Sequence, residues 1–242
     1  MSAKTLIFIP TYNERDNAPR ICREIFALGL DADLLFTDDN SPDGTGKVLD
    51  ELKPEFPRLF IHHRNGKLGI GSAHQEAITW AYDNSYHRLV TLDCDFTHFP
   101  SDIPKMITAV NGFGVAVGSR FIKSESLPGW SPLRRLMTAG GHLLTKHLLG
   151  ISQDASGAFR VYDLLKIDSK IFGLVTSTGY GFFFESLHVL YRNNIRINEI
   201  PIILPSRISG DSKMTLREVW KGLIHLFKVA ALARVKPSRF RV

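Results

Sequence analysis

The chain has 242 residues, of which 44% are hydrophobic and 22% charged. This composition suits a globular protein with a sizeable core and excludes a disordered chain. Its two cysteines, Cys22 and Cys94, stand in no metal-binding spacing, which argues against a disulfide scaffold and favours a reducing compartment. The apolar run at 5–10 is too short for a signal peptide, and no run reaches the roughly 18 residues of a membrane-spanning helix. We therefore expect a cytoplasmic protein.

The positive charge is concentrated at the C-terminus. Residues 213–242 carry eight Lys and Arg against one acid, Glu218, or +7, whereas the whole chain carries +6 and the remainder therefore −1. A basic segment of this kind is typical of a surface for lipid headgroups, nucleic acid or a phosphorylated substrate. A solvated basic tail is the alternative.

Short apolar runs alternate with helical patterns in the first half of the chain, which predicts βαβ units and a mainly parallel α/β sheet flanked by helices. The expected strands are 6–9, 34–37, 59–61, 89–92 and 115–117. The expected helices are 18–28, 47–55, 72–84 and 103–110.

The pattern changes after residue 120. We expect a loop at 121–131, a long helix at 132–149, a strand at 196–204, a polar loop at 205–213 and a last helix at 215–235. No low-complexity linker divides the chain. The simplest organisation is one compact domain, 1–212, with 213–242 as a helical appendage.

Two acids follow the expected strand 89–92. In extended backbone, side chains two residues apart point the same way, so Asp93 and Asp95 share one side at the carboxyl edge of the sheet. Paired carboxylates bind Mg²⁺ or Mn²⁺, which takes its other ligands from water and substrate phosphates. Such an ion neutralises the charge that develops on a departing diphosphate. Taken alone, the same pair is also typical of loop capping.

Polar side chains also follow the first two expected strands. Asp39 stands in an Asp-Asp-Asn-Ser-Pro-Asp-Gly-Thr segment whose later part is typical of a turn, while its two leading acids suit ribose hydroxyls. After the first strand, Tyr12 could stack on a base and Glu14 could accept from base N–H groups; a turn and helix start is the alternative. Segments 44–47 and 69–74 match neither a P-loop nor a dinucleotide fingerprint.

The order and spacing of these segments resemble a known family. The motifs are 10–14 (PTYNE), 38–45 (DDNSPDGT), 67–71 (KLGIG), 93–98 (DCDFTH) and 118–120 (GSR). Together they resemble the family 2 glycosyltransferases of GT-A fold. Four further features extend the resemblance to the dolichyl-phosphate (polyprenyl-phosphate) mannosyltransferases. They are Trp130 with Arg134, segment 154–160, segment 179–180 with Glu185, and segment 207–214.

The resemblance implies a Rossmann-like GT-A fold and a role for each matching residue. The expected nucleotide-sugar ligands are Pro10, Tyr12, Glu14, Thr37, Asp39, Asp93, Cys94, Asp95, Arg207 and Lys213. The expected metal ligands are Asp93, Asp95 and Thr97. The expected acceptor-phosphate ligands are Arg120, Arg134 and Thr138, and the catalytic group comprises Asp93, Asp95, Arg120 and Arg134. Cys94 and Thr97 depart from the usual Ala and Gln or Ser of the family.

The resemblance further implies inverting transfer of a mannosyl group from GDP-mannose to a polyprenyl (dolichyl) phosphate, giving a β-linked product, with Mg²⁺ or Mn²⁺. A phosphate acceptor is already largely dianionic at neutral pH and needs no general base, whereas an alcohol acceptor could use Asp154 or Glu185. The absence of a Gln-x-x-Arg-Trp segment favours a single transfer. A UDP-glucose or UDP-N-acetylglucosamine donor and an inactive nucleotide-binding scaffold remain the alternatives.

The last expected helix is amphipathic. Its apolar positions are Leu216, Val219, Trp220, Leu223, Phe227, Ala230 and Ala231, and its cationic stripe is Arg217, Lys221, His225 and Lys228. This pattern suits a helix lying in the headgroup region of a membrane, and so a peripheral protein on the cytoplasmic face. The alternative is a helix packed on the domain with only its stripe exposed. We expect no nucleic-acid partner, and a membrane-anchoring subunit remains open.

Overall fold

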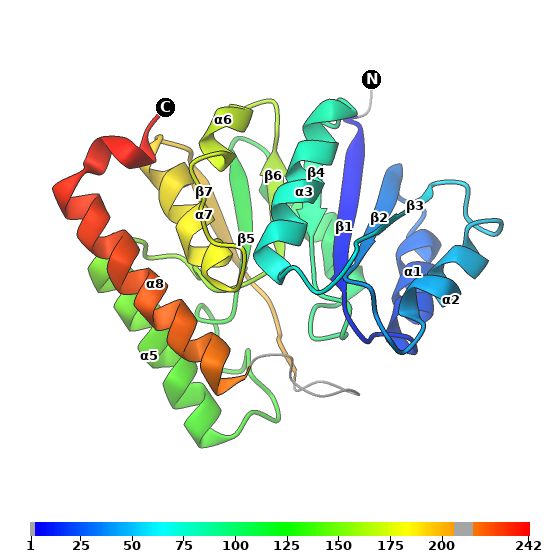
Figure 1. Cartoon of the computed structure of the whole chain (residues 1–242), viewed down its shortest axis with the longest axis horizontal. Coiled ribbons are helices and arrows are strands. Elements are labelled where there is room, and N and C mark those ends of the chain that lie inside the picture. Colours follow the sequence, from blue (N-terminus) through cyan, green and yellow to red (C-terminus); the bar gives the residue numbers. More distant parts are fainter. Residues whose placement is uncertain (1–2, 206–214) are drawn as a thin grey trace.

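Seven strands form one sheet in the order β3-β2-β1-β4-β6-β5-β7 in the computed structural model, which describes residues 3–205 and 215–242 (Figure 1). The strands are β1 (Thr5–Thr11), β2 (Ala32–Asp38), β3 (Leu59–His63), β4 (Arg88–Thr91), β5 (Val115–Ser119), β6 (Arg160–Asp163) and β7 (Ile197–Pro201). The helices are α1 (Asn17–Ala27), α2 (Thr45–Leu52), α3 (Ile70–Asp83), α4 (Ile103–Ala109), α5 (Pro132–Leu149), α6 (Ser169–Phe172), α7 (Gly181–Arg192) and α8 (Leu216–Val235). The expected mainly parallel α/β fold is confirmed.

The order of the strands places a switch point beside β1. From β1 the chain runs outward through β2 to β3 and then returns to β4 on the other side of β1, with all these pairs parallel. The carboxyl ends of β1, β2 and β4 therefore open a crevice at one edge of the sheet. Ligands bind at such switch points in open α/β sheets.

Strand β6 runs antiparallel between β4 and β5, and the sequence pattern did not predict it. It is four residues long and begins with Arg160, which is fully buried. Helix α7 was also missed, and its residues from Gly181 to Leu190 are all buried. Strand β7 ends at Pro201, earlier than the expected 204.

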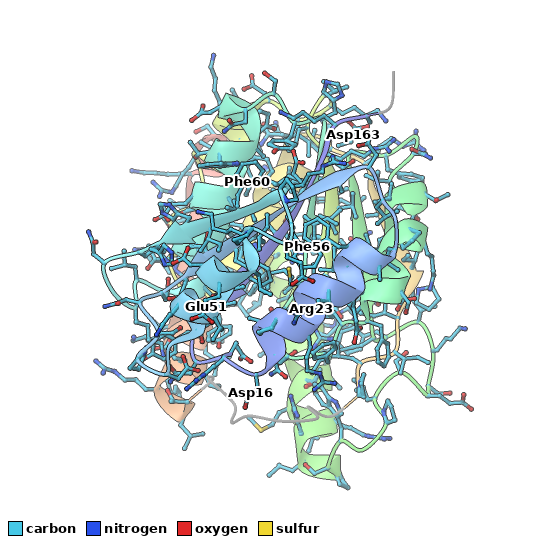
Figure 2. All side chains as sticks on the ribbon, turned by 90° about the vertical axis from the view of Figure 1, so that its right-hand side faces the viewer. Asp16, Arg23, Glu51, Phe56, Phe60 and Asp163 are labelled. Carbon is cyan, nitrogen blue, oxygen red and sulfur yellow. The ribbon has the colours of Figure 1, made fainter. Side chains whose placement is uncertain are left out.

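The two faces of the sheet carry separate cores, because side chains alternate along each strand. Leu6 and Phe8 pack with buried residues of α3, α7 and α8. Ile7 and Ile9 pack with buried residues of α1, α2 and α4 on the opposite face. Figure 2 looks onto α1 and α2, with Arg23 on α1 and Phe56 just after α2. The sheet thus lies between two helical layers that fix its carboxyl edge.

Helix α8 packs against α5 and α7, and α5 and α8 lie side by side at one end of the molecule (Figure 1). Leu226, Val229 and Ala230 are its buried residues and belong to the same core as α7. The expected boundary between 212 and 213 falls outside the described residues, so the division into a domain and an appendage stays a prediction. No helix within 3–205 or 215–242 is long and apolar enough to cross a membrane.

Candidate active site

A cleft of about 1210 Å³ opens at the carboxyl edge of the sheet. Its walls come from the ends of β1, β2 and β4, the turn before α3, helix α5, residues 176–181 and one face of α8. The predicted site residues that line it are Pro10, Tyr12, Glu14, Asp39, Asp93, Cys94, Asp95, Thr97, Arg120 and Arg134. Residues distant in the sequence therefore meet in one cleft.

The carboxylate pair follows β4 in a tight turn. Asp95 is 4% exposed, and its Oδ1 accepts from the backbone N–H of Thr97 at 3.1 Å and from the Thr97 hydroxyl at 2.6 Å. Phe96 has a φ of +58°, a left-handed conformation that is strained for an aromatic residue. Burial raises the pKa of the Cys94 thiol, which therefore stays protonated and small beside the pair. Thr97 thus orients Asp95, and its role as a metal ligand stays a prediction.

His98 also supports the pair, a role that the sequence did not reveal. Its Nδ1 accepts from the backbone N–H of Asp93 at 3.2 Å. Burial lowers the pKa of His98 to about 4, so the ring is neutral at pH 7 and Nδ1 can act as an acceptor. Asp93 is thereby held by its backbone while its side chain, 31% exposed, faces the cleft.

Two carboxylates fit a hard divalent ion that completes its shell with water and phosphate oxygens. Within 3–205 and 215–242 no group of three or more His, Cys, Asp or Glu side chains could hold a metal ion. Asp93 and Asp95 would therefore hold Mg²⁺ or Mn²⁺ together with a substrate diphosphate, as the chemistry of the pair allows.

The residues expected to bind the nucleoside lie at the ends of β1 and β2. Lys67 places its Nζ 4.0 Å from the centre of the Tyr12 ring, a cation–π contact at the edge of the cleft. The backbone N–H of Glu14 donates to the Thr45 hydroxyl at 2.9 Å, which fixes the turn after β1. Thr37 is 1% exposed within β2 and is not among the described residues that line the cleft, so its role stays a prediction.

Arg64 is a site residue that the sequence analysis missed. Its side chain is 2% exposed, and its Nη1 lies 2.5 Å from Asp39 Oδ1. The Nη2 atom donates to the Ser72 hydroxyl at 2.5 Å and to Glu76 at 3.1 Å, both on α3. The second oxygen of Asp39 accepts from the backbone N–H of Gly69 at 3.3 Å. Arg64 therefore ties Asp39 to the start of α3.

The turn before α3 packs backbone to backbone against residues 178–179. Gly69 has a φ of +103°, and a Cβ there would lie 2.5 Å from the Thr178 carbonyl oxygen. A Cβ on Gly71 would lie 2.6 Å from the Gly179 carbonyl oxygen, and the Ser72 N–H donates to Thr178 at 3.0 Å. The Gly69-Ile70-Gly71 segment, which matches no dinucleotide fingerprint, thus requires glycine for close approach to residues 178–179.

Arg120 also lines the cleft. Its Nε and Nη2 donate to the two oxygens of Asp154 at 2.7 and 3.1 Å, and Nη2 also donates to Ser156 at 3.1 Å. Burial alone would raise the pKa of Asp154, but the Arg120 guanidinium and several N–H donors lower it. Asp154 is therefore ionised and orients Arg120, so the structure gives it no base-like setting.

Arg134 stands on the first turn of α5, with its guanidinium carbon 3.6 Å from the centre of the Trp130 ring. The stacked contact holds the side chain at the cleft. Thr138, one turn further along α5, is half-buried and is not among the described residues that line the cleft. Arg207 and Lys213 lie outside the described residues, so their expected roles stay predictions.

The cationic stripe of α8 faces the cleft. Arg217, Lys221, His225 and Lys228 all line it. His225 Nε2 lies 2.8 Å from Glu185 Oε2, and Glu185 also accepts from the Ser177 N–H and the Thr176 hydroxyl. Burial alone would raise the pKa of Glu185, but His225 and the other donors lower it, so this carboxyl is ionised and orients its neighbours.

Comparison with known proteins agrees with this architecture. The model of glycosyl transferase family 2 matches residues 6–167. The chain is 32% identical over 230 residues to the polyprenol monophosphomannose synthase of Mycolicibacterium smegmatis, covering 94% of this chain and 86% of that protein. It is 30% identical over 240 residues to the undecaprenyl-phosphate mannosyltransferase of Micrococcus luteus, covering 99% of both.

Solved structures share the fold at low sequence identity. A mannosyltransferase from Pyrobaculum calidifontis in complex with GDP-Man and Mn²⁺ superposes with a TM-score of 0.60 at 13% identity, over 96% of this chain and 65% of that one. S. aureus TarS 1-349 in complex with UDP-GlcNAc gives 0.61 at 11% identity, over 95% and 66%. The chain thus spans just under two thirds of the length of these structures.

The fold, the carboxylate pair at its carboxyl edge and the family match define one class. The chain belongs to glycosyl transferase family 2 and is a hexosyltransferase of GT-A fold.

Proposed function

We propose that the protein transfers a mannosyl group from GDP-mannose to a polyprenyl phosphate with inversion, giving a β-linked polyprenyl-phosphate mannose. The observation that carries the proposal is the cleft itself. It is lined by two groups, the carboxylate pair Asp93 and Asp95 and the arginines Arg120 and Arg134. A metal-bound nucleoside diphosphate fits the first and a phosphate acceptor fits the second. The named activities of the two bacterial relatives support this assignment.

Asp93 and Asp95 would hold Mg²⁺ or Mn²⁺, which supplies charge neutralisation for the departing diphosphate. The residues around them prepare the pair before the donor arrives: Thr97 fixes one oxygen of Asp95, and His98 fixes the backbone of Asp93. At the nucleoside end, Tyr12 would stack on the guanine. Asp39 would accept from the ribose hydroxyls, since Arg64 and Gly69 hold its carboxylate in place.

The two carboxylates considered as bases for an alcohol acceptor are both bonded to other groups, which supports a phosphate acceptor. Asp154 is committed to Arg120, and Glu185 is committed to Thr176, Ser177 and His225. An alcohol would need one of these carboxylates to take its proton, whereas a phosphate dianion attacks without one. Attack from the side opposite the nucleotide inverts the anomeric centre.

Helices α5 and α8 would dock on the cytoplasmic face of a membrane as a peripheral surface. Both expose large apolar side chains: Leu133, Leu136, Met137, Trp220, Ile224 and Phe227 are each more than half exposed. Exposed apolar groups on two neighbouring helices exceed what a helix packed only on its own domain requires. A lipid acceptor in that membrane would then lie next to the cleft, because α5 and α8 both form part of its wall.

The donor is tested by a panel of radiolabelled GDP- and UDP-sugars with a short polyprenyl phosphate and Mn²⁺. We expect lipid-linked product with GDP-mannose. Product with UDP-glucose or UDP-N-acetylglucosamine alone would overturn the mannosyl assignment, and no product with any donor would favour an inactive scaffold.

Sedimentation with anionic liposomes tests the membrane surface, because Trp220→Ser should reduce binding, and undiminished binding would contradict that surface.

A further inference from the structure

Arg160 is a buried arginine to which the proposed mechanism gives no part. It begins β6, is 0% exposed, and makes no ion pair with a carboxylate in the part of the chain that the structure describes. A charge is costly to remove from water unless hydrogen bonds replace its hydration. The groups that bond this guanidinium therefore show what the side chain holds in place.

The buried guanidinium joins the pre-β6 segment, residues 154–158, to α7. Its Nε donates to the Gly157 carbonyl at 2.9 Å, and its Nη2 donates to the Ala155 carbonyl at 3.1 Å. On the α7 side, Nη2 donates to the Phe183 carbonyl at 2.9 Å and Nη1 to the Ser186 hydroxyl at 3.0 Å. Because the guanidinium is planar and rigid, these bonds fix the pre-β6 backbone relative to α7.

The pre-β6 segment also carries the partners of Arg120. Asp154 bonds Arg120 through both carboxylate oxygens, and the Ser156 hydroxyl bonds its Nη2. The two carbonyls held by the buried guanidinium stand on either side of Ser156 in the sequence. A Cβ on Gly157 would lie 3.5 Å from Arg120 Nη2, so the backbone of the segment lies next to the Arg120 guanidinium. A shift of this backbone would therefore move the groups that orient Arg120.

We propose that Arg160 is a positioning residue for acceptor binding, because its bonds to the pre-β6 segment set the orientation of Arg120. The role rests on the proposed function, in which Arg120 binds the acceptor phosphate. An arginine pairs bidentately with phosphate only when its fork is presented in the right plane, so acceptor binding should depend on this backbone. Asp39 is held instead by Arg64 and Gly69, so donor binding should not depend on Arg160.

The test measures steady-state KM values for farnesyl phosphate and for GDP-mannose in the full-length protein with Mn²⁺. Arg160→Met removes every donor, and Arg160→Lys keeps the charge but offers a single nitrogen. We expect Arg160→Met to fold, because apolar side chains often replace a buried ion without loss of the fold. Ser186→Ala is the matched control, because it removes a bond on the α7 side and leaves those to the pre-β6 segment.

We expect the KM for farnesyl phosphate to rise about tenfold in both Arg160 variants, the weight of one charge-assisted hydrogen bond. The KM for GDP-mannose in these variants, and both KM values of Ser186→Ala, should stay within about twofold of the wild type.

A double-mutant cycle with Arg120→Lys separates positioning from a general effect on the fold. Lysine cannot form the two-pronged bond that Arg120 makes with Asp154. In the Arg120→Lys background, Arg160→Met should therefore change the KM for farnesyl phosphate by less than about twofold. Equal factors in the two backgrounds would show that Arg160 acts independently of Arg120 and would overturn the proposal.

The outcomes also separate the positioning role from the proposed function. Wild-type turnover with an unchanged KM for farnesyl phosphate in Arg160→Met overturns the positioning role alone. An equal rise in Ser186→Ala, or loss of the near-UV circular dichroism in both Arg160 variants, assigns Arg160 to the fold and overturns it too. If only one of the two variants folds, that variant decides. No wild-type turnover of farnesyl phosphate with any sugar nucleotide overturns the proposed function and the positioning role with it.

Discussion

Arg64 Nη1 contacts Asp39 Oδ1 at 2.5 Å, with both side chains less than 10% exposed. The contact joins the end of β3 to the residue expected to bind the ribose, and its other donors reach Ser72 and Glu76 on α3. A buried guanidinium that bonds a carboxylate fixes the position of that carboxylate. Asp39 is therefore held in place by a residue that does not line the cleft.

We predict that Arg64→Met weakens GDP binding by about 10- to 100-fold, since the carboxylate of Asp39 loses a charge-assisted partner. Isothermal titration with GDP and with 2′,3′-dideoxy-GDP measures the effect. The loss should nearly vanish for the dideoxy nucleotide, which offers Asp39 no hydroxyl. Arg23→Met, which removes an exposed pair with Glu55, is the control. Equal losses for both nucleotides would mean that Arg64 only maintains the fold.

Metal dependence follows from the carboxylate pair. Chelation by EDTA should abolish sugar transfer, and Mn²⁺ or Mg²⁺ should restore it, because Asp93 and Asp95 cannot neutralise a departing diphosphate themselves. Asp95→Asn should lower kcat by at least 100-fold at saturating metal, by analogy with the loss of other groups that stabilise transition-state charge. Full activity in EDTA, or in Asp95→Asn, would contradict the metal-dependent mechanism.

We predict that residue 71 must be glycine because α3 approaches the backbone of residues 178–179 closely there, and not because the helix itself requires glycine. Gly71→Ala places a methyl group 2.6 Å from the Gly179 carbonyl oxygen, so the backbone of residues 178–179 must shift. Gly140→Ala on α5 meets nothing within 4 Å and should stabilise the protein by about 0.5–1 kcal/mol. Urea denaturation measures the free energy of unfolding of both variants. A stabilising Gly71→Ala would show that the two segments are not in contact.

Buried histidines predict that acid destabilises the protein. Burial lowers the pKa of His74 to about 3 and of His188 to about 4, both from 6.5. The unfolded chain then binds more protons than the folded one between pH 6.5 and about 4, so stability falls as pH falls through this window. His74→Phe, in contact with Phe8 and Phe182, should flatten the pH dependence of the urea midpoint. His147→Gln, at an exposed position, should not, and equal slopes in both would contradict the assignment.

Local signals predicted much of the fold. Helix 132–149 has the predicted bounds because Ser131 and Pro132 start it and Gly150, with a φ of +72°, ends it. The first five strands were predicted because they are continuous apolar runs. Strand β6 was missed because it has only four residues and begins with a buried arginine. Helix α7 was missed because its buried stretch includes the polar residues Glu185, Ser186 and His188, which interrupt the apolar pattern.

The candidate site was likewise predicted only in part. The motif residues after β1, β2 and β4 meet because the carboxyl ends of parallel strands share an edge. Arg64 was not predicted, because its contact depends on the pairing of β2 with β3, in which Asp38 faces His63. The sequence also could not orient α8, whose apolar residues lie on two sides: Leu226 is buried in the core, whereas Phe227 is 54% exposed. A third side of α8, which carries the cationic stripe, lines the cleft.

The acceptor assay tests the central claim most directly. GDP-[¹⁴C]mannose and Mn²⁺ are incubated with the protein and either a polyprenyl phosphate or the corresponding polyprenol, and lipid-extractable radioactivity is counted. We predict product with the phosphate and none with the alcohol, because the carboxylates Asp154 and Glu185 are committed to other partners. Product with the alcohol, or none with the phosphate, would contradict the account.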